Sequence, residues 1–90
     1  MTKIVYVKWV DAQIIHGQRT IKAGNKEPAL IMESAGIYLS EDEDVLRFAV
    51  DLIHNEEDEA DWDSRGTSII PKAYITEMRI FDTESNDAAD

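Results

Sequence analysis

Residues Thr67–Ile80 read TSIIPKAYITEMRI and carry the clearest fold signal in the chain. The pattern predicts a short strand over Thr67–Ile70, a single helical turn over Pro71–Tyr74 and a last strand over Ile75–Phe81. Proline suits the start of such a turn because its ring fixes φ at about −65°. The segment carries no catalytic motif, so it informs the fold and leaves the function to the rest of the chain.

Length and composition predict one small domain without disulfides. The chain has 90 residues, 43% of them hydrophobic, and no cysteine. A domain of this size buries only about 60% of the surface of its unfolded chain, so its core is thin. We expect the domain to span residues 1–82 and the polar, acidic residues 83–90 to form a disordered tail. The lack of cysteine fits a cytoplasmic protein. The first residues turn polar at Lys8, too early for a signal peptide or a membrane span.

The charge is strongly acidic and unevenly distributed. The net charge is −10, which argues against direct binding to nucleic acid and favours a basic protein partner. Residues 1–26 carry five basic groups and one acidic group, whereas residues 27–90 carry four basic and 18 acidic groups. The two parts therefore have net charges of +4 and −14. This asymmetry is compatible with a homo-oligomer, and the plainer interpretation is that solvated charge keeps a small protein soluble.

The N-terminal part predicts one strand and a long loop. Lys3–Val10 alternates and is rich in β-branched and aromatic residues, so we expect a strand with Val5, Val7 and Trp9 facing inward. The connection Asp11–Lys26 is long for a compact domain, and long loops often bind partners.

A bent strand and a charged turn follow. Ala29–Leu39 is mostly apolar, and Gly36 within it predicts a sharp bend or bulge of the kind that closes a barrel. The next residues, Ser40–Asp44, form a charged turn. Inward positions of Met78 and Ile80 in the last strand would complete the same core.

The segment Val45–Ile53 fits two interpretations. As a strand, it lines one face with apolar side chains, namely Leu46, Phe48, Val50 and Leu52. As a helix over about 41–54 it forms an apolar stripe, with Ser40 and Glu43 as a capping box, and this would give an α+β fold. We favour the strand, because the flanking segments read as β and need a partner.

The segment Ile70–Ile75 resembles the proline–x–x–tyrosine–aliphatic turn that precedes the last strand of SH3 domains. The predicted order of elements is also similar to an SH3-like barrel. The resemblance implies a mainly β fold, a small five-stranded barrel with a single 3-10 turn before the last strand. No Ala-Leu-Tyr-type motif opens the chain and no tryptophan pair follows the second strand, so the resemblance does not extend to binding of proline-rich peptides.

A second resemblance covers about residues 4–81. Small uncharacterised proteins encoded by phages and prophages share a similar layout, which is carried here by Trp9–Ala12, Glu33–Leu39, the acidic turn Glu41–Asp44 and Ile70–Ile75. The resemblance implies a phage accessory protein in the host cytoplasm and supports the strand at Val45–Ile53. It implies no chemistry.

The densest cluster of charge is the acidic loop at residues 55–66, which surrounds Trp62. Its acidic residues are Glu56, Glu57, Asp58, Glu59, Asp61 and Asp63. A calcium loop starting at Asp61 fails, because Arg65 and Lys72 occupy two ligand positions. Trp62 either packs over the end of the barrel or contacts a partner.

These patterns favour a non-enzymatic protein-interaction module. We expect it to bind a protein partner through loops 11–26 and 55–66, with His16 and Arg19 contributing from the first loop. The sequence offers no catalytic triad, no phosphate-binding loop and too few histidines for a zinc site, so no cofactor or metal is expected. Two alternatives remain, an acidic DNA mimic that inhibits a host nucleic-acid-binding protein, and a small-ligand binder built at a subunit interface.

Overall fold

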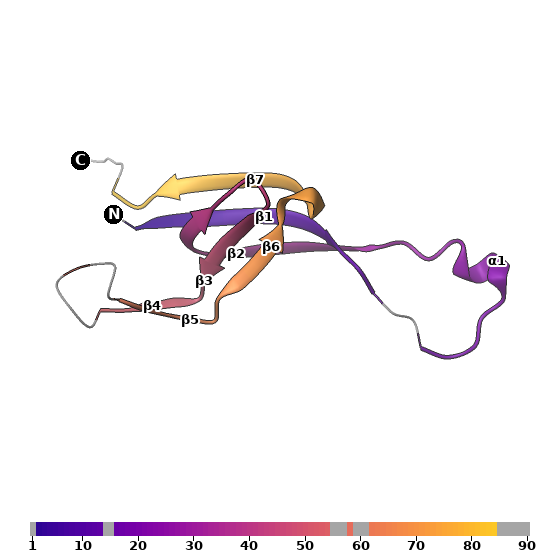
Figure 1. The fold of residues 1–90 in the computed structure, drawn as a ribbon. Helices are drawn as coiled ribbons and strands as arrows, with labels where there is room; N and C mark the ends of the chain where they lie inside the picture. The colour runs from indigo at the N-terminus through magenta and orange to yellow at the C-terminus, as the bar shows by residue number, and fades with distance from the viewer. Residues whose placement is uncertain (1, 14–15, 55–57, 59–61, 85–90) are drawn as a thin grey trace.

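The computed structural model describes residues 2–13, 16–54, 58 and 62–84 and shows a mainly β protein (Figure 1). Five strands form an antiparallel sheet in the order β6-β3-β2-β1-β7, and two more strands form a separate hairpin. The elements are β1 (Lys3–Asp11), α1 (Ile21–Gly24), β2 (Leu30–Glu41), β3 (Val45–Ala49), β4 (Asp51–Ile53), β5 (Asp63–Arg65), β6 (Ser68–Pro71), a 3-10 turn (Lys72–Tyr74) and β7 (Ile75–Asp82).

The five-stranded sheet is open, and this corrects the prediction of a closed barrel. Within the described residues, β6 and β7 are the two edges and do not pair with each other. β6 has only four residues and ends in Pro71, which has no N–H to donate to a further strand. The 3-10 turn then carries the chain away from β6 to the far side of β1.

The core lies on the concave side of the sheet and is small. Its buried side chains are Val5, Val7, Leu46, Phe48 and Ile70, and half-buried Trp9 packs against them. This confirms the inward positions predicted for the first strand. The indole N–H of Trp9 donates to the Ser34 hydroxyl at 3.1 Å, so the polar end of the ring is satisfied.

The segment after the charged turn is a strand, which confirms the favoured interpretation and rules out the helix over 41–54. β3 pairs with β2 on one side and with β6 on the other, which buries Leu46 and Phe48. The Asp42 carboxylate accepts hydrogen bonds from the backbone N–H groups of Asp44 and Val45 at 2.8 and 2.9 Å. An acidic side chain that could have capped a helix therefore stabilises a turn between two strands.

The predicted inward position of Val50 is wrong. Val50 separates β3 from β4 and is 69% exposed. Its N–H donates to the carbonyl groups of Arg65 and Gly66, at 3.0 and 3.3 Å. Gly66 has a φ of 68°, a left-handed conformation that favours glycine. This irregularity ends the alternation of β3, so β4 and β5 (Asp51–Ile53 and Asp63–Arg65) form a hairpin of their own.

Gly36 acts through close packing. A Cβ atom at this position would lie 2.6 Å from Cδ2 of Phe48 and 2.8 Å from the carbonyl oxygen of Ala49. The irregularity in the pairing of β2 with β3 falls slightly later, between Tyr38 and Ser40. The predicted bulge is therefore present near Gly36, while the glycine itself makes room for a core ring.

The closing segment largely matches its prediction. The turn over Lys72–Tyr74 is a 3-10 helix preceded by Pro71, and β7 follows at once. Met78 and Ile80 pair with Val7 and Val5, so they lie on the core side of the sheet. They remain 37% and 39% exposed, because β7 is an edge strand with no neighbour on its other side among the described residues.

A small polar network ties the 3-10 turn to the β2–β3 hairpin. The Glu41 carboxylate lies 2.6 Å from the ammonium group of Lys72 and accepts a hydrogen bond from the Tyr38 hydroxyl at 3.1 Å. The Lys72 hydrogen bond lowers the pKa of Glu41 below its ordinary value of 4.5. Hydrogen bonds from the backbone lower the pKa of Asp42 in the same way.

Because the pKa values of Glu41 and Asp42 are lower in the folded state, the unfolded chain binds more protons at acid pH. Their contribution to the free energy of unfolding is complete above the ordinary pKa values. It is lost as the pH falls through the pKa values of the folded state. We expect Glu41→Gln to reduce the free energy of unfolding at pH 7 by about 1 kcal/mol or less. In urea titrations at pH values from 7 to 3, the free energy of unfolding of this variant should fall less steeply with decreasing pH than that of the wild-type protein. Glu43→Gln, on the same turn, is the control, and equal slopes for both variants would contradict the assignment.

Candidate interaction surfaces

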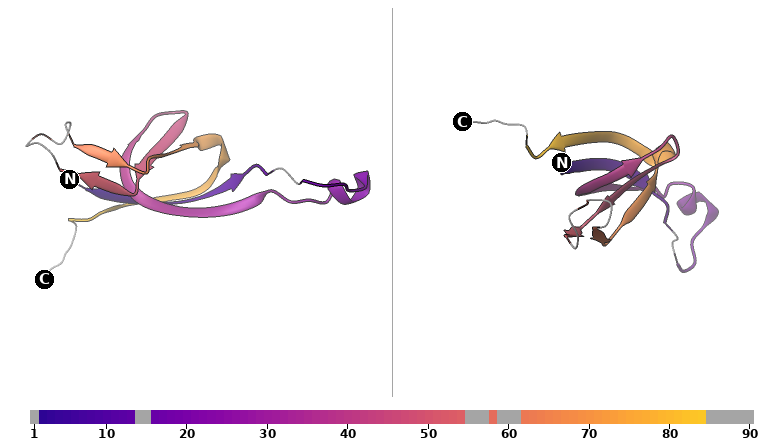
Figure 2. Two further views of the ribbon diagram at one scale, coloured as in Figure 1. Left: turned by 90° about the horizontal axis from the view of Figure 1, so that it is seen from below. Right: turned by 60° about the vertical axis from the view of Figure 1, so that its left-hand side comes forward.

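The connection between β1 and β2 is an arm that extends away from the sheet (Figures 1 and 2). We define the arm as residues 12–29, and every residue in it that the structure describes is exposed. The molecule measures 58 × 30 × 22 Å, and its radius of gyration is 17.8 Å. A compact chain of this length would have a radius of gyration of about 12 Å. The arm therefore lengthens the molecule, and none of its described residues belongs to the core.

The arm is held in a defined conformation by local hydrogen bonds. The Thr20 hydroxyl accepts from the backbone N–H of Ala23 at 3.1 Å, which caps α1. At the base, the Gln13 side-chain amide donates to the carbonyl of Pro28 at 2.7 Å, joining the two sides of the arm. Arg19 and Glu27 form an ion pair at 3.4 Å. These contacts join the two sides of the arm and give its tip a local fold.

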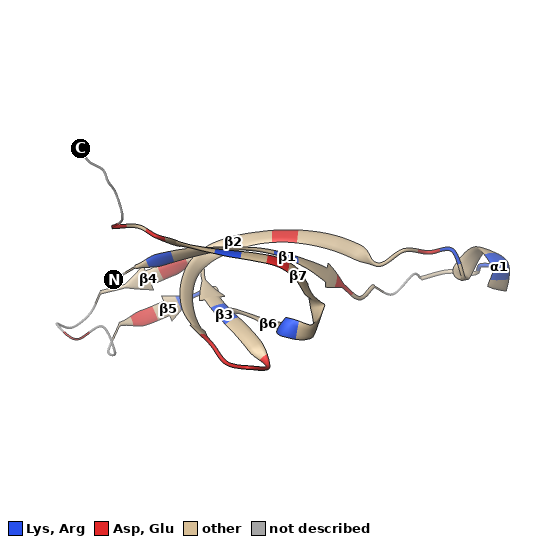
Figure 3. Cartoon of the chain, turned by 90° about the horizontal axis from the view of Figure 1, so that it is seen from above, with Lys and Arg blue, Asp and Glu red and all other residues tan. Residues whose placement is uncertain are grey.

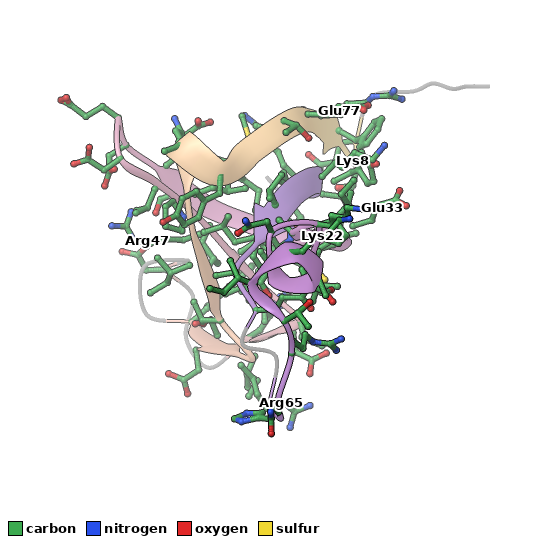
Figure 4. The ribbon with its side chains drawn as sticks, turned by 90° about the vertical axis from the view of Figure 1, so that its right-hand side faces the viewer. Lys8, Lys22, Glu33, Arg47, Arg65 and Glu77 are labelled. Carbon is green, nitrogen blue, oxygen red and sulfur yellow. The ribbon has the colours of Figure 1, made fainter. Side chains whose placement is uncertain are left out.

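The tip of the arm is both apolar and basic. Ile21 is 84% exposed, the highest value for a large hydrophobic residue in the described chain. Lys22 and Lys26 follow it in the sequence and take part in no ion pair with a described residue. Lys22 is labelled on α1 in Figure 4, in the view along the arm. An exposed isoleucine beside two lysines is a surface suited to an apolar partner with carboxylates.

A pocket lies at the opposite end of the molecule, between the β4–β5 hairpin and the start of β1. We call it the distal pocket. It has a volume of about 390 Å³ and is lined by Thr2, Lys3, Ile37, Tyr38, Leu39, Leu52, Trp62 and Ser64. Trp62 is half-buried and stacks on His54, with ring centroids 3.6 Å apart and an interplanar angle of 17°. The tryptophan thus packs against its own chain and also forms a wall of the pocket.

The residues predicted to bind a partner fall into two separate groups. His16 and Arg19 are exposed in the arm, while Trp62 and the exposed Asp58 and Asp63 belong to the other end. The remaining four predicted residues, Glu56, Glu57, Glu59 and Asp61, lie outside the described residues. The spacing of the acidic side chains is therefore untested, and the DNA-mimic hypothesis stays a prediction.

A charged row lies on the face of the sheet opposite the core and has no counterpart among the sequence predictions. Lys8 on β1 pairs in register with Glu33 on β2 and Glu77 on β7, and Figure 4 shows the three on one side of the ribbon. The hydroxyl of Tyr6 donates to Glu33 at 2.8 Å, which raises the pKa of the tyrosine. Only the strand register brings these residues together, so no local motif could have revealed them.

The arginines of the body are engaged locally. Arg47 pairs with Asp42 at 3.1 Å, Arg65 with Asp51 at 2.7 Å, and Arg79 with Glu77 at 2.6 Å. Figure 4 shows Arg47 and Arg65 on different sides of the molecule, away from the Lys8 row. Lys72 pairs with Glu41, so the remaining basic groups are concentrated in the arm, apart from Lys3 and Lys8.

No described group of three or more histidine, aspartate or glutamate side chains is arranged to hold a metal ion. In the same residues, no helix has the length and apolar character needed to cross a bilayer. Comparison with protein-family models, curated proteins and solved structures found no match for the chain.

Proposed function

We propose that this chain is a non-enzymatic protein-interaction module whose arm is its main docking element. The observation that carries the proposal is Ile21, which is 84% exposed at the tip of an arm held by hydrogen bonds. A solvent-exposed apolar side chain favours association, because burying it against a partner contributes about 1.5–3 kcal/mol. The flanking lysines favour an acidic surface on the partner.

The acidic end of the molecule supports a second contact, with a partner surface of the opposite charge. Asp58 and Asp63 are exposed there, and Asp63 lies between the pocket residues Trp62 and Ser64 in the sequence. Such a surface fits a basic partner, as the net charge of −10 already indicates. One protein could thus bridge two surfaces of different charge.

We also propose that the strand layout is SH3-like, with the sheet left open between its edges. The strand order, the long β2 shared by both halves of the sheet and the 3-10 turn before β7 support this. Phage or prophage origin and a place in the host cytoplasm belong to the same proposal. Genes for virion parts beside its coding sequence would suggest a structural role, and early genes a role in host takeover.

We expect Ile21→Asp to abolish partner binding without changing the fold. The immobilised protein and its variants would be incubated with host lysate, and captured proteins quantified by mass spectrometry. A specific partner should fall at least tenfold with Ile21→Asp, because the substitution removes the apolar contact and places a carboxylate beside Lys22.

The matched control is Ile69→Asp, the same change at an isoleucine that is 62% exposed on β6, away from the arm. It should leave capture unchanged, and thermal melting should show both variants folded. Equal capture by the wild-type protein and Ile21→Asp would rule out the arm as the docking element.

A further inference from the structure

The two ends of the molecule are complementary in charge. At the arm, Arg19, Lys22 and Lys26 face only Glu27 as a described acidic group. At the opposite end, the described acidic residues are Asp51, Asp58, Asp63, Asp82 and Glu84, against the basic Lys3 and Arg65. Figure 3 shows this separation, with basic residues marked on α1 and acidic residues on β4 and β5.

The two ends are also complementary in shape. The arm presents one prominent apolar side chain, Ile21, on a short helical turn. The distal pocket is a concave surface of about 390 Å³ with Ile37, Leu39, Leu52 and Trp62 among its lining residues. A pocket at the lower end of the range of about 300–1,000 Å³ for small-molecule sites has room for a single branched side chain and its neighbours.

Docking within one molecule is excluded by the fold. The arm leaves the sheet at Asp11, the last residue of β1, whereas Thr2 and Lys3 at the first end of β1 line the distal pocket. The length of β1 therefore separates the two surfaces, as Figures 1 and 2 show. A strand rises about 3.3 Å per residue, so the nine residues of β1 alone keep them about 30 Å apart.

We propose that the arm of one copy of this chain docks into the distal pocket of a second copy. Ile21 enters the pocket beside Trp62, and Lys22 and Lys26 face the carboxylates near it, Asp82 and Glu84. Asp82 lies opposite the lining residue Lys3 in the register of β1 with β7. The inference rests on the proposed function and names its partner, a second copy. Because the arm and the pocket are different surfaces, the contact is head-to-tail, and each added copy leaves one arm and one pocket free.

The test uses light scattering after size exclusion on the full chain over a range of protein concentrations. The wild-type protein and Ile69→Asp should show a mass above that of the monomer that rises with concentration. Ile21→Asp and Ser64→Arg should each stay monomeric, since one disables the arm and the other places a cation in the pocket. Ser64 is exposed, so the arginine is compatible with the fold, and Thr2→Arg, at another lining residue, is a second pocket variant.

Mixing the two variants distinguishes this contact from a symmetric one. Ile21→Asp keeps an intact pocket and Ser64→Arg keeps an intact arm, so an equimolar mixture should form a dimer of twice the monomer mass and nothing larger. Raising the salt concentration should weaken that dimer, because the charges involved are exposed. A mixture that stays monomeric, although each variant melts like the wild-type protein, would overturn the head-to-tail contact.

The remaining outcomes separate this inference from the proposed function. A wild-type protein that is monomeric at every concentration and at low salt overturns self-docking. If Ile21→Asp nevertheless loses a captured partner, the arm still binds a different protein and the proposed function stands. If Ile21→Asp alters neither the mass nor the capture, both fail.

Discussion

Phe48→Ala should lower the free energy of unfolding by about 3–5 kcal/mol. Phe48 is 5% exposed, packs with the buried core residues and lies directly over Gly36. A domain of this length has a total stability of about 5–13 kcal/mol, so the substitution removes a large fraction of it. The thin core offers few other large side chains that could move into the cavity.

Urea denaturation followed by circular dichroism at 25 °C would measure this loss. The control is Phe81→Ala, the same change at a half-exposed position on the edge strand β7, for which we expect about 1 kcal/mol or less. Similar losses for the two variants would mean that Phe48 is not the centre of the core.

Gly36→Ala should also be strongly destabilising, by about 1–3 kcal/mol. The added methyl group would lie 2.6 Å from Cδ2 of Phe48 and 2.8 Å from the backbone oxygen of Ala49, so the ring and a strand must both shift. The φ angle at Gly36 is not left-handed, so the cost comes from overpacking. Gly24→Ala, where no heavy atom lies within 4 Å of the new methyl group, should be neutral or slightly stabilising.

A double-mutant cycle would test whether Gly36 and Phe48 are in contact. With Phe48→Ala in place the ring is gone, and Gly36→Ala should cost at least 0.5 kcal/mol less than it does in the wild-type protein, a typical coupling between residues in contact. Part of the cost should remain because the carbonyl of Ala49 does not move with the ring. Strictly additive losses would show that Gly36 and Phe48 do not meet as described.

The features that the sequence predicted well are those with a local chemical cause. Pro71 started the single turn, alternation placed Val5, Val7 and Trp9 inward, and β-rich neighbours correctly outweighed the helical pattern of the segment after Ser40. The strand after Ser40 is favoured because the flanking β segments need a strand to pair with. The local signals by themselves, an apolar stripe and the capping box of Ser40 and Glu43, slightly favour the helix.

The features that the sequence did not predict depend on contacts between distant residues. Val50 follows the alternation of β3, yet Gly66 and Arg65 hold its backbone at the junction of two hairpins. Whether the sheet is open or closed depends on which strands pair at its two edges. The distal pocket is assembled from the beginning of β1, the middle of β2 and the β4–β5 hairpin. The sequence predicts the arm as a binding loop, but no local pattern in it indicates the short helix or the exposure of Ile21.

The pairing of β1 with β7 also bears on how fast the protein can fold. Lys3 lies opposite Asp82, and Val5 lies opposite Ile80, so this part of the sheet joins the two ends of the described chain. Such non-local pairing is slow, and domains dominated by it typically fold in milliseconds to seconds. During synthesis, β1 can pair with β2 long before β7 leaves the ribosome. Its other edge therefore stays open to other nascent chains until the last strand arrives.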